Sequence, residues 1–257
     1  MKRALITGIN NYPGTRNDLN GCVNDAKEWK GLLINKYGYN EIRTLFNDNV
    51  TIKNVTNNMI DVVKSSKDGD KLAITYSGHG SKARDRNGDE PDKIDETWYL
   101  YDGHLLDDTI RSIISKLNKN VRLTIISDSC HSGTVSRAFL STMSDETYYA
   151  KPRYMPPEDE IEAITMGAPV ARKFLQENDM NHILITGAKS TEYSYDAYFD
   201  KPMGAMSYYA INILKKTPNI TYEQFYKQLR KQLPSGKYKQ TPQLEGRQEY
   251  KNRIMFS

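Results

Sequence analysis

The sequence predicts an α/β fold in which a mostly parallel central sheet is flanked by helices, and three observations indicate it. Short apolar runs alternate with segments whose apolar residues recur every three or four positions, the rhythm of strands and helices. Residues 71–76 are apolar on both faces, as central strands of a parallel sheet are. The length of 257 residues, with 38% hydrophobic, suits one large domain with a modest core.

The expected elements alternate regularly up to residue 127. Strands are expected at residues 3–9, 42–46, 71–76, 97–101 and 121–127. The first expected helix is amphipathic, with apolar residues at Leu19, Cys22, Ala26, Trp29 and Leu33. The second carries Ile52, Val55, Met59 and Val62, and the third carries Ile110, Ile113, Ile114 and Leu117. Residues 81–95 are expected to form a polar loop.

The regular alternation stops at residues 134–180. The part from 151 to 160 is rich in proline and charge and shows no periodicity, which predicts a linker. Order resumes with a strand at 182–187, followed by helices around 205–214 and 221–233 and a short final strand within 240–256. The last of these helices begins with a capping box formed by Thr221 and Gln224.

Composition and charge favour a soluble protein that binds neither nucleic acid nor membrane. The net charge is +4, and the lysines are spread along the chain rather than clustered. No apolar run of 18 residues and no secretory leader pattern occurs. With only two cysteines, Cys22 and Cys130, we expect both thiols to be free in a reducing, cytoplasmic setting.

Two glycine-bearing turns carry the residues of the expected site. Cys130 lies just past the strand 121–127, and His79 lies just past the strand 71–76. In such sheets ligands bind beyond the carboxyl ends of the strands, where both residues are expected. A cysteine thiolate is a strong nucleophile, and an imidazole can supply the base and later protonate the leaving amine. We therefore expect a Cys–His dyad, although a lone cysteine is more often a small buried hydrophobe.

The same turns contain the expected oxyanion donors. The backbone N–H of Gly78 or Gly80, together with that of Cys130, is expected to stabilise the oxyanion of a reaction intermediate. The glycines beside His79 also suit a tight turn and the close approach of a substrate backbone.

These two segments carry a specific resemblance to a known family. Residues 76–80, Tyr-Ser-Gly-His-Gly, and 128–133, Asp-Ser-Cys-His-Ser-Gly, resemble the signature blocks of metacaspases and their prokaryotic relatives, cysteine peptidases of the caspase-like clan, family C14. Residues 8–12, 19–26, 187–205 and 240–246 resemble further blocks of the family. The resemblance implies a caspase-like three-layer sandwich over residues 1–257, with a large-subunit-like portion at about 1–136, a linker at 137–180 and a small-subunit-like portion at 181–257. It also implies a monomer.

The expected specificity is for a basic side chain before the cut bond. Asp128 stands two residues before the nucleophile, where caspases have a glutamine, and a carboxylate attracts cationic side chains. The resemblance adds Asp25, Cys22 and Ser77 to this first specificity pocket, the S1 pocket, and implies cleavage of protein or peptide substrates after arginine or lysine. The alternatives are a helix-start acid for Asp25 and a turn cap for Asp128.

The resemblance also implies that Ca²⁺ could activate the enzyme, although the chemistry itself requires no cofactor. Asp95, Asp107 and Asp108 align with acids that bind activating Ca²⁺ in many metacaspases, and carboxylates suit that cation. A further acid of the family is replaced by Arg137 here, which removes a ligand. The alternative for Asp107 or Asp108 is a helix N-cap that needs no metal.

Basic residues in the linker suggest that the enzyme cuts itself. If cleavage follows arginine or lysine, the candidate self-cleavage sites are Lys151, Arg153, Arg172 and Lys173. The sequence does not choose among them, and ordinary surface charges are the alternative.

The sequence thus predicts an arginine- or lysine-specific cysteine endopeptidase. The alternatives are a caspase-like peptidase with another preference, such as asparagine, a thiol hydrolase of small amides, and a non-catalytic interaction module with the caspase fold. The intact His79–Cys130 pair argues against the last, since a scaffold needs neither residue.

Overall fold

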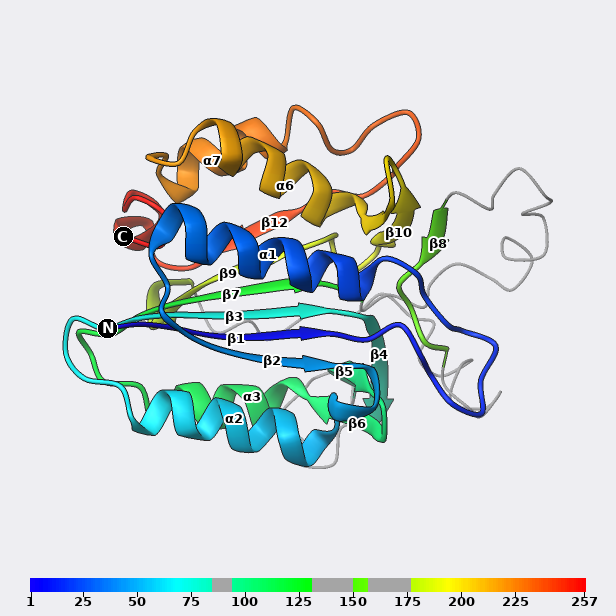
Figure 1. The fold of residues 1–257 in the computed structure, drawn as a ribbon, viewed down its shortest axis with the longest axis horizontal. Coiled ribbons are helices and arrows are strands. Elements are labelled where there is room, and N and C mark those ends of the chain that lie inside the picture. The colour runs from blue at the N-terminus through cyan, green and yellow to red at the C-terminus, as the bar shows by residue number, and fades with distance from the viewer. Residues whose placement is uncertain (85–93, 131–149, 157–176) are drawn as a thin grey trace.

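The structure is a computed structural model and describes residues 1–84, 94–130, 150–156 and 177–257 (Figure 1). Its described part centres on a six-stranded sheet with the order β12-β9-β7-β3-β1-β2. The strands are β1 (Lys2–Gly8), β2 (Glu41–Phe46), β3 (Lys71–Ser77), β7 (Arg122–Asp128), β9 (His182–Thr186) and β12 (Gln243–Glu245). Neighbouring strands are parallel except at the β12–β9 edge, so the predicted mostly parallel sheet is confirmed.

Helices cover both faces of this sheet and bury its apolar residues. The helices α1 (Cys22–Tyr37), α6 (Ala205–Lys216) and α7 (Tyr222–Leu229) lie on one face, and α2 (Ile52–Lys64) and α3 (Asp107–Ile114) lie on the other (Figure 1). Each face has its own buried cluster, one around Trp29 and Leu33 and one around Val55 and Met59. The three layers confirm the predicted α/β class.

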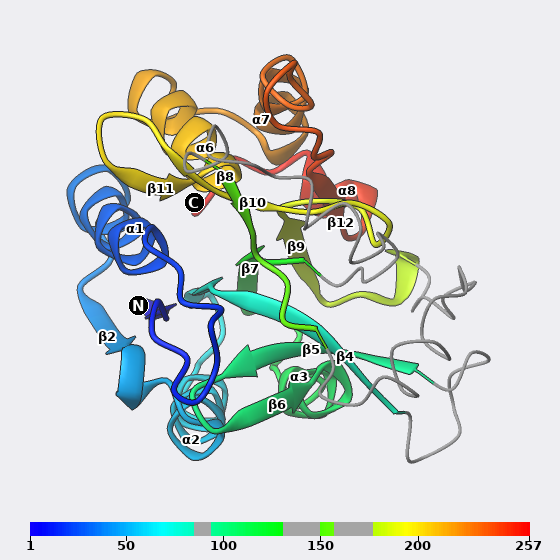
Figure 2. The ribbon, with the colours of Figure 1, turned by 90° about the vertical axis from the view of Figure 1, so that its right-hand side faces the viewer.

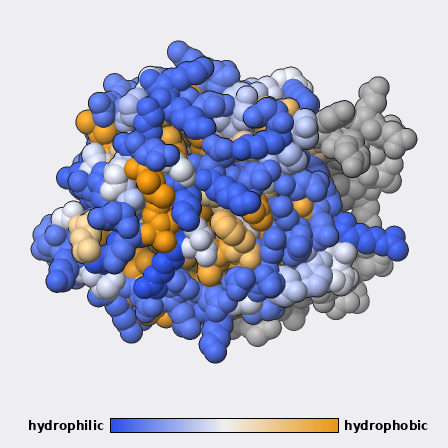
Figure 3. Space-filling view, viewed as in Figure 1, coloured by the Kyte–Doolittle hydropathy of each residue, from blue (hydrophilic) through white to orange (hydrophobic). Residues whose placement is uncertain are grey.

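Short elements complete the described chain. They are the 3₁₀ turns η1 (Asn47–Asn49) and η3 (Glu177–Asp179) and the helix α8 (Gln248–Lys251). Figure 3 shows a largely hydrophilic face with scattered apolar side chains. Within the described residues, no helix combines the length and the apolar character needed to cross a membrane.

Two small antiparallel sheets lie beyond the carboxyl ends of the central strands (Figure 1). One contains β4 (His79–Arg84), β5 (Ile94–Leu100) and β6 (Gly103–Leu106). The other contains β8 (Ala150–Pro152), β10 (Tyr195–Tyr198) and β11 (Pro202–Gly204). Residues 81–84, expected in a polar loop, therefore continue β4, and part of the expected linker forms β8.

Candidate active site

The carboxyl ends of β3 and β7 form the candidate active site, and Figure 2 looks onto this edge of the sheet. The register of the two strands pairs Ser77 with Asp128. His79 and Cys130 each follow two residues beyond this pair, so neighbouring strands deliver both residues to the same edge. Their exposed fractions are 0% and 1%, which means that the site is closed in this structure.

His79 is fixed through its backbone and its ring. Its N–H donates to the Tyr12 hydroxyl at 2.7 Å, and its carbonyl accepts from the Tyr76 hydroxyl at 2.6 Å. Ring Nε2 lies 2.6 Å from the carbonyl oxygen of Asn17, and because that oxygen can only accept, Nε2 carries the proton. Nδ1 has no hydrogen-bond partner among the described residues. Burial lowers the pKa of His79 to about 3, so the ring is neutral and Nδ1 is a free proton acceptor.

Within the part of the chain that the structure describes, the Cys130 thiol forms hydrogen bonds with one neighbour, Ser194. Sγ donates to the Ser194 carbonyl oxygen at 3.1 Å and accepts from the Ser194 N–H at 2.6 Å. Burial raises the pKa of Cys130 far above its usual range. The resting thiol is therefore protonated, and its proton goes to Ser194 rather than to His79.

Two backbone N–H groups converge on one carbonyl oxygen beside the thiol. Gly80 N–H and Cys130 N–H donate to the carbonyl oxygen of Arg153 at 2.9 and 3.1 Å. Gly78, the other candidate donor, instead packs tightly, because a Cβ there would lie 2.6 Å from the Tyr76 hydroxyl. Gly80 and Cys130 thus have the geometry of an oxyanion hole, and Gly78 permits close packing under His79.

The side chain of Arg153 ends in a buried cluster of carboxylates. One guanidinium nitrogen lies 2.7 Å from Asp25 and 2.9 Å from Asp196, and the other lies 3.2 Å from Asp128. The arginine side chain is 0% exposed, and the three acids are between 0% and 3% exposed. We call Arg153 with these three acids the S1 cluster. Its three carboxylates outnumber its one guanidinium, so the cavity has an excess of acid charge.

Backbone groups at the start of α6 orient two of these carboxylates. The N–H of Gly204 donates to Asp25 at 2.9 Å, and the N–H of Ser207 donates to Asp128 at 3.0 Å. Ser207 lies in the first turn of α6, where N–H groups have no partner inside the helix. Burial raises the pKa of Asp25 to about 7, against the opposing effect of the Arg153 charge.

Asp196 is the acid of this cluster that sequence reasoning missed. Its carboxylate also accepts the N–H groups of Asn20 at 2.7 Å and Gly21 at 3.0 Å, just before α1. It lies on β10 within residues 187–205, a region singled out only as a family-like block. An acid between Tyr195 and Ala197 carries no local signal, since two of its partners, Asn20 and Gly21, are about 175 residues away.

Cys22 and Ser77, the other residues expected in the S1 pocket, lie beside the cluster without bonding to the guanidinium. Cys22 is fully buried at the start of α1, and burial raises the pKa of its thiol, while the nearby Arg153 charge lowers it. Ser77 is buried at the end of β3, opposite Asp128 in the sheet. Both cysteines are unpaired.

The candidate self-cleavage residues differ in their surroundings. Arg153 enters the S1 cluster, whereas the Lys151 ammonium donates to the carbonyl oxygen of Asp18 at 2.6 Å, outside the acid cavity. Arg172 and Lys173 lie outside the described residues, as does Arg137.

The acids expected to bind calcium contact an arginine. Asp107 and Asp108 begin α3, and both form ion pairs with Arg111 one turn later; we call these three residues the α3 cluster. Asp95 lies on β5, near the end of the β5–β6 pair that leads into α3. Among the described residues, no three His, Cys, Asp or Glu side chains are grouped to hold a metal ion. The Arg111 guanidinium already forms ion pairs with two of the three expected ligands.

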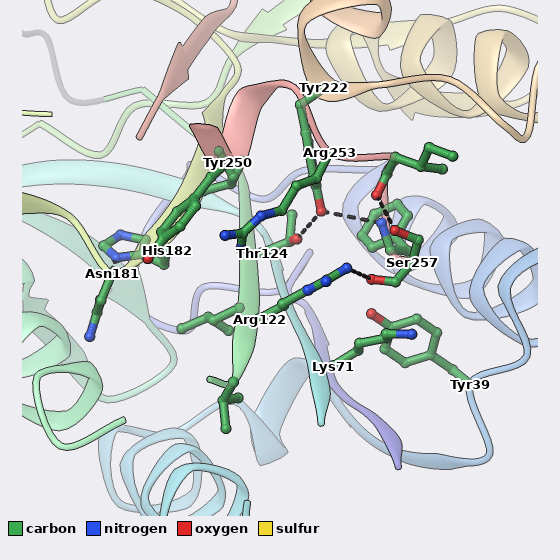
Figure 4. A pocket seen from close by; sticks show the side chains of 15 residues that line it. Tyr39, Lys71, Arg122, Thr124, Asn181, His182, Tyr222, Tyr250, Arg253 and Ser257 are labelled. Atoms are coloured by element: carbon green, nitrogen blue, oxygen red, sulfur yellow. Dashed lines mark hydrogen bonds between the residues drawn. The ribbon is translucent and has the colours of Figure 1, made fainter. Parts of the chain in front are cut away.

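A separate hollow lies at the opposite end of the sheet (Figure 4). Lys71, Arg122 and His182 line it, and each is the first residue of its strand, β3, β7 or β9. Because the strands are parallel, this hollow is a strand length away from His79 and Cys130 and belongs to no part of the candidate active site.

Known proteins of one family resemble this chain over most of its length. The family model of the metacaspase peptidase C14 domain matches residues 2–138. Metacaspase-1B of Aspergillus fumigatus is 33% identical over 289 residues, which cover 95% of this chain and 69% of that protein. Metacaspase-1 of Saccharomyces cerevisiae is 33% identical over 286 residues, which cover 95% of this chain and 66% of that protein. This chain therefore spans about two thirds of the length of these relatives.

A solved structure has a similar fold over the whole chain. Protein GSU0716 from Geobacter sulfurreducens superposes with a TM-score of 0.75 at 26% identity, covering 100% of this chain and 98% of that one. This likeness supports the caspase-like fold that was expected. The family match and the curated relatives together identify the family: the chain belongs to the metacaspases, a family of cysteine peptidases.

Proposed function

We propose that the chain is a cysteine endopeptidase that cuts after arginine or lysine, and that its first substrate is its own Arg153–Tyr154 bond. One observation carries the proposal: the carbonyl oxygen of Arg153 accepts from Gly80 and Cys130 while its guanidinium occupies the acid cavity. The carbonyl beside the nucleophile and the side chain that defines specificity thus belong to the same residue.

The main chain on both sides of Arg153 is bound as a substrate strand would be. Before it, β8 pairs with β10, and the N–H of Arg153 donates to Ser194 at 2.9 Å. After it, the N–H of Met155 donates to the carbonyl oxygen of Gly80 at 2.8 Å. Such added-strand binding is a common way to recognise an extended peptide.

The chemistry follows from these positions. Cys130 gives its proton to Nδ1 of His79, and Sγ attacks the carbonyl carbon of Arg153. The oxyanion that forms accepts from Gly80 and Cys130, in the same place as the resting carbonyl oxygen. His79 then protonates the nitrogen of Tyr154 as the C–N bond breaks, and water hydrolyses the thioester to release the Arg153 carboxylate.

The closed site favours a slow first turnover. Burial raises the pKa of Cys130 and lowers that of His79, so proton transfer between them is unfavourable while residues 150–156 lie against the site. Departure of the linker would hydrate both groups and bring their pKa values closer together. Self-cleavage would therefore turn a latent chain into an active one.

The acid cavity explains the proposed preference. Removing the guanidinium would leave Asp25, Asp128 and Asp196 buried without a cation, which is strongly unfavourable. An arginine or lysine of a substrate restores the cation, whereas an aspartate adds a fourth negative charge.

The remaining expectations are separate proposals. We propose that the chemistry needs no cofactor and that the protein works as a monomer in the reducing cytoplasm, where a free thiol persists. Ca²⁺ at the α3 cluster would be an activator only, and it would have to displace Arg111 from Asp107 and Asp108.

The test is to follow the purified chain by intact mass and to sequence the new amino terminus. We expect fragments 1–153 and 154–257, with no cleavage in Cys130→Ala or Arg153→Gln and unchanged cleavage in the matched control Lys151→Gln. Fluorogenic peptides ending in Arg, Lys, Asp or Asn then test cleavage in trans. Hydrolysis after aspartate, or a processed Cys130→Ala chain, would contradict the proposal.

A further inference from the structure

The chain beyond the proposed cut bond continues into a second enclosed position. Met155 is 3% exposed and belongs to the buried cluster that also contains Ile9, Tyr12 and Leu19. Tyr154, between the cut bond and Met155, is only partly buried, and its ring lies 6.1 Å from that of Tyr193. The second residue after the bond is thus enclosed more completely than the first.

The backbone of Met155 is fixed by the strand that carries the oxyanion donor. Its N–H donates to the Gly80 carbonyl oxygen at 2.8 Å, and its carbonyl oxygen accepts from the Ser81 hydroxyl at 2.8 Å. Gly80 therefore binds the scissile carbonyl through its N–H and the residue two positions later through its carbonyl. These two hydrogen bonds of Gly80 fix the register of the bound peptide. The side chain two residues after the cut bond's arginine therefore always lies at the same place.

Resting on the proposed function, we infer that this place is a specificity pocket, an S2′ pocket, which selects substrates with an apolar residue of about the size of methionine two positions after the cut arginine or lysine. The Asn17 side-chain amide lies 3.2 Å from Sδ of Met155, at the polar end of an otherwise apolar enclosure. Methionine is flexible and polarizable and suits such an irregular enclosure. A carboxylate there would be buried without a cation.

Asn17 links this pocket to the dyad. The same residue whose amide contacts Met155 offers its carbonyl oxygen to Nε2 of His79. A filled pocket therefore bears on the loop that orients the catalytic imidazole. Substrates that fill the pocket are therefore expected to have a higher kcat as well as a lower KM.

The test varies the substrate and leaves the enzyme unchanged, so that folding defects cannot enter. The self-processed enzyme is given quenched peptides Lys-Pro-Arg-Tyr-X-Pro, in which X is Met, Leu, Ala or Asp. We expect kcat/KM to fall about tenfold from Met to Ala and about a hundredfold from Met to Asp, with Leu close to Met. A matched series that changes Tyr to Ala and keeps Met should change the rate less, since that position is half open.

The outcomes separate the two proposals. Equal rates for all four peptides, each cut after arginine, would overturn the S2′ pocket and leave the proposed function standing. Cleavage of none of them, or cleavage elsewhere, would overturn both. Discrimination in KM alone would support the pocket and overturn the link through Asn17.

Discussion

The S1 cluster and the α3 cluster pair arginine with aspartates in very different surroundings. In the S1 cluster every charged side chain is at most 3% exposed. In the α3 cluster the three side chains are 22–39% exposed. Both clusters combine one guanidinium with carboxylates, three in the S1 cluster and two in the α3 cluster, and they differ most in the access of water.

This difference decides what each cluster can do. Ion pairs that water reaches are worth about 0–1 kcal/mol, so the α3 cluster can lose its arginine at little cost. Breaking a buried pair costs about 3–5 kcal/mol, because the remaining charges are not solvated. Of the two, the buried cluster therefore has the stronger requirement for a cation, and the proposed preference for arginine or lysine rests on that requirement.

The largest expected effect is on stability, from a matched pair of substitutions. In a Cys130→Ala background, which keeps the chain uncut, Arg153→Gln should lower the free energy of unfolding by about 3–5 kcal/mol. Arg111→Gln should lower it by less than about 1 kcal/mol. Urea unfolding measures both. Similar small losses would mean that the acid cavity fills with water freely and has no strong need for a cation.

A smaller effect should appear in the pH dependence of stability. Burial raises the pKa of Asp25 from 3.8 to about 7, so between these values the native carboxyl keeps a proton that the unfolded chain has released. Its contribution to stability is thus greatest below about pH 4 and is lost as the pH rises towards 7. In the Cys130→Ala chain, Asp25→Asn should remove this decline.

His79 has the opposite effect on the pH dependence of stability, but it does not obscure the effect of Asp25. The pKa of His79 is lowered to about 3, so it adds stability as the pH rises through the same range. Because His79 is present in both chains, the difference between their unfolding free energies isolates Asp25. Curves that stay parallel from pH 4 to pH 7 would show that Asp25 has an ordinary pKa.

The sequence could predict that His79 and Cys130 lie at the same edge of the sheet, because their positions follow from local features. Apolar runs mark β3 and β7, and glycine-bearing turns follow each of them directly. Once the strands pair in register, the residues just beyond them reach the same edge of the sheet. His79, Cys130 and Asp128 therefore required little tertiary information.

Long-range partners could not be predicted in this way. Asp196 joins the S1 cluster through contacts to Asn20 and Gly21, which no periodicity relates to it. Arg153 was one of four basic candidates that look alike locally, and only the pairing of β8 with β10 distinguishes it. The strands of that small sheet are three or four residues long and partly polar, too short for an alternating pattern to be recognised.

The smallest expected effect concerns calcium at the α3 cluster. Ca²⁺ takes six to eight oxygen ligands, and here Arg111 already contacts two of the three expected carboxylates. We expect a chelator to leave the rate of self-cleavage unchanged, and Asp108→Asn to alter stability by less than about 1 kcal/mol. A rate that rises with added Ca²⁺ in the natural chain but not in Asp108→Asn would contradict this. In that case Arg111 must leave the acids when the metal binds, and Arg111→Gln, by removing the competing cation, should increase the apparent affinity for Ca²⁺.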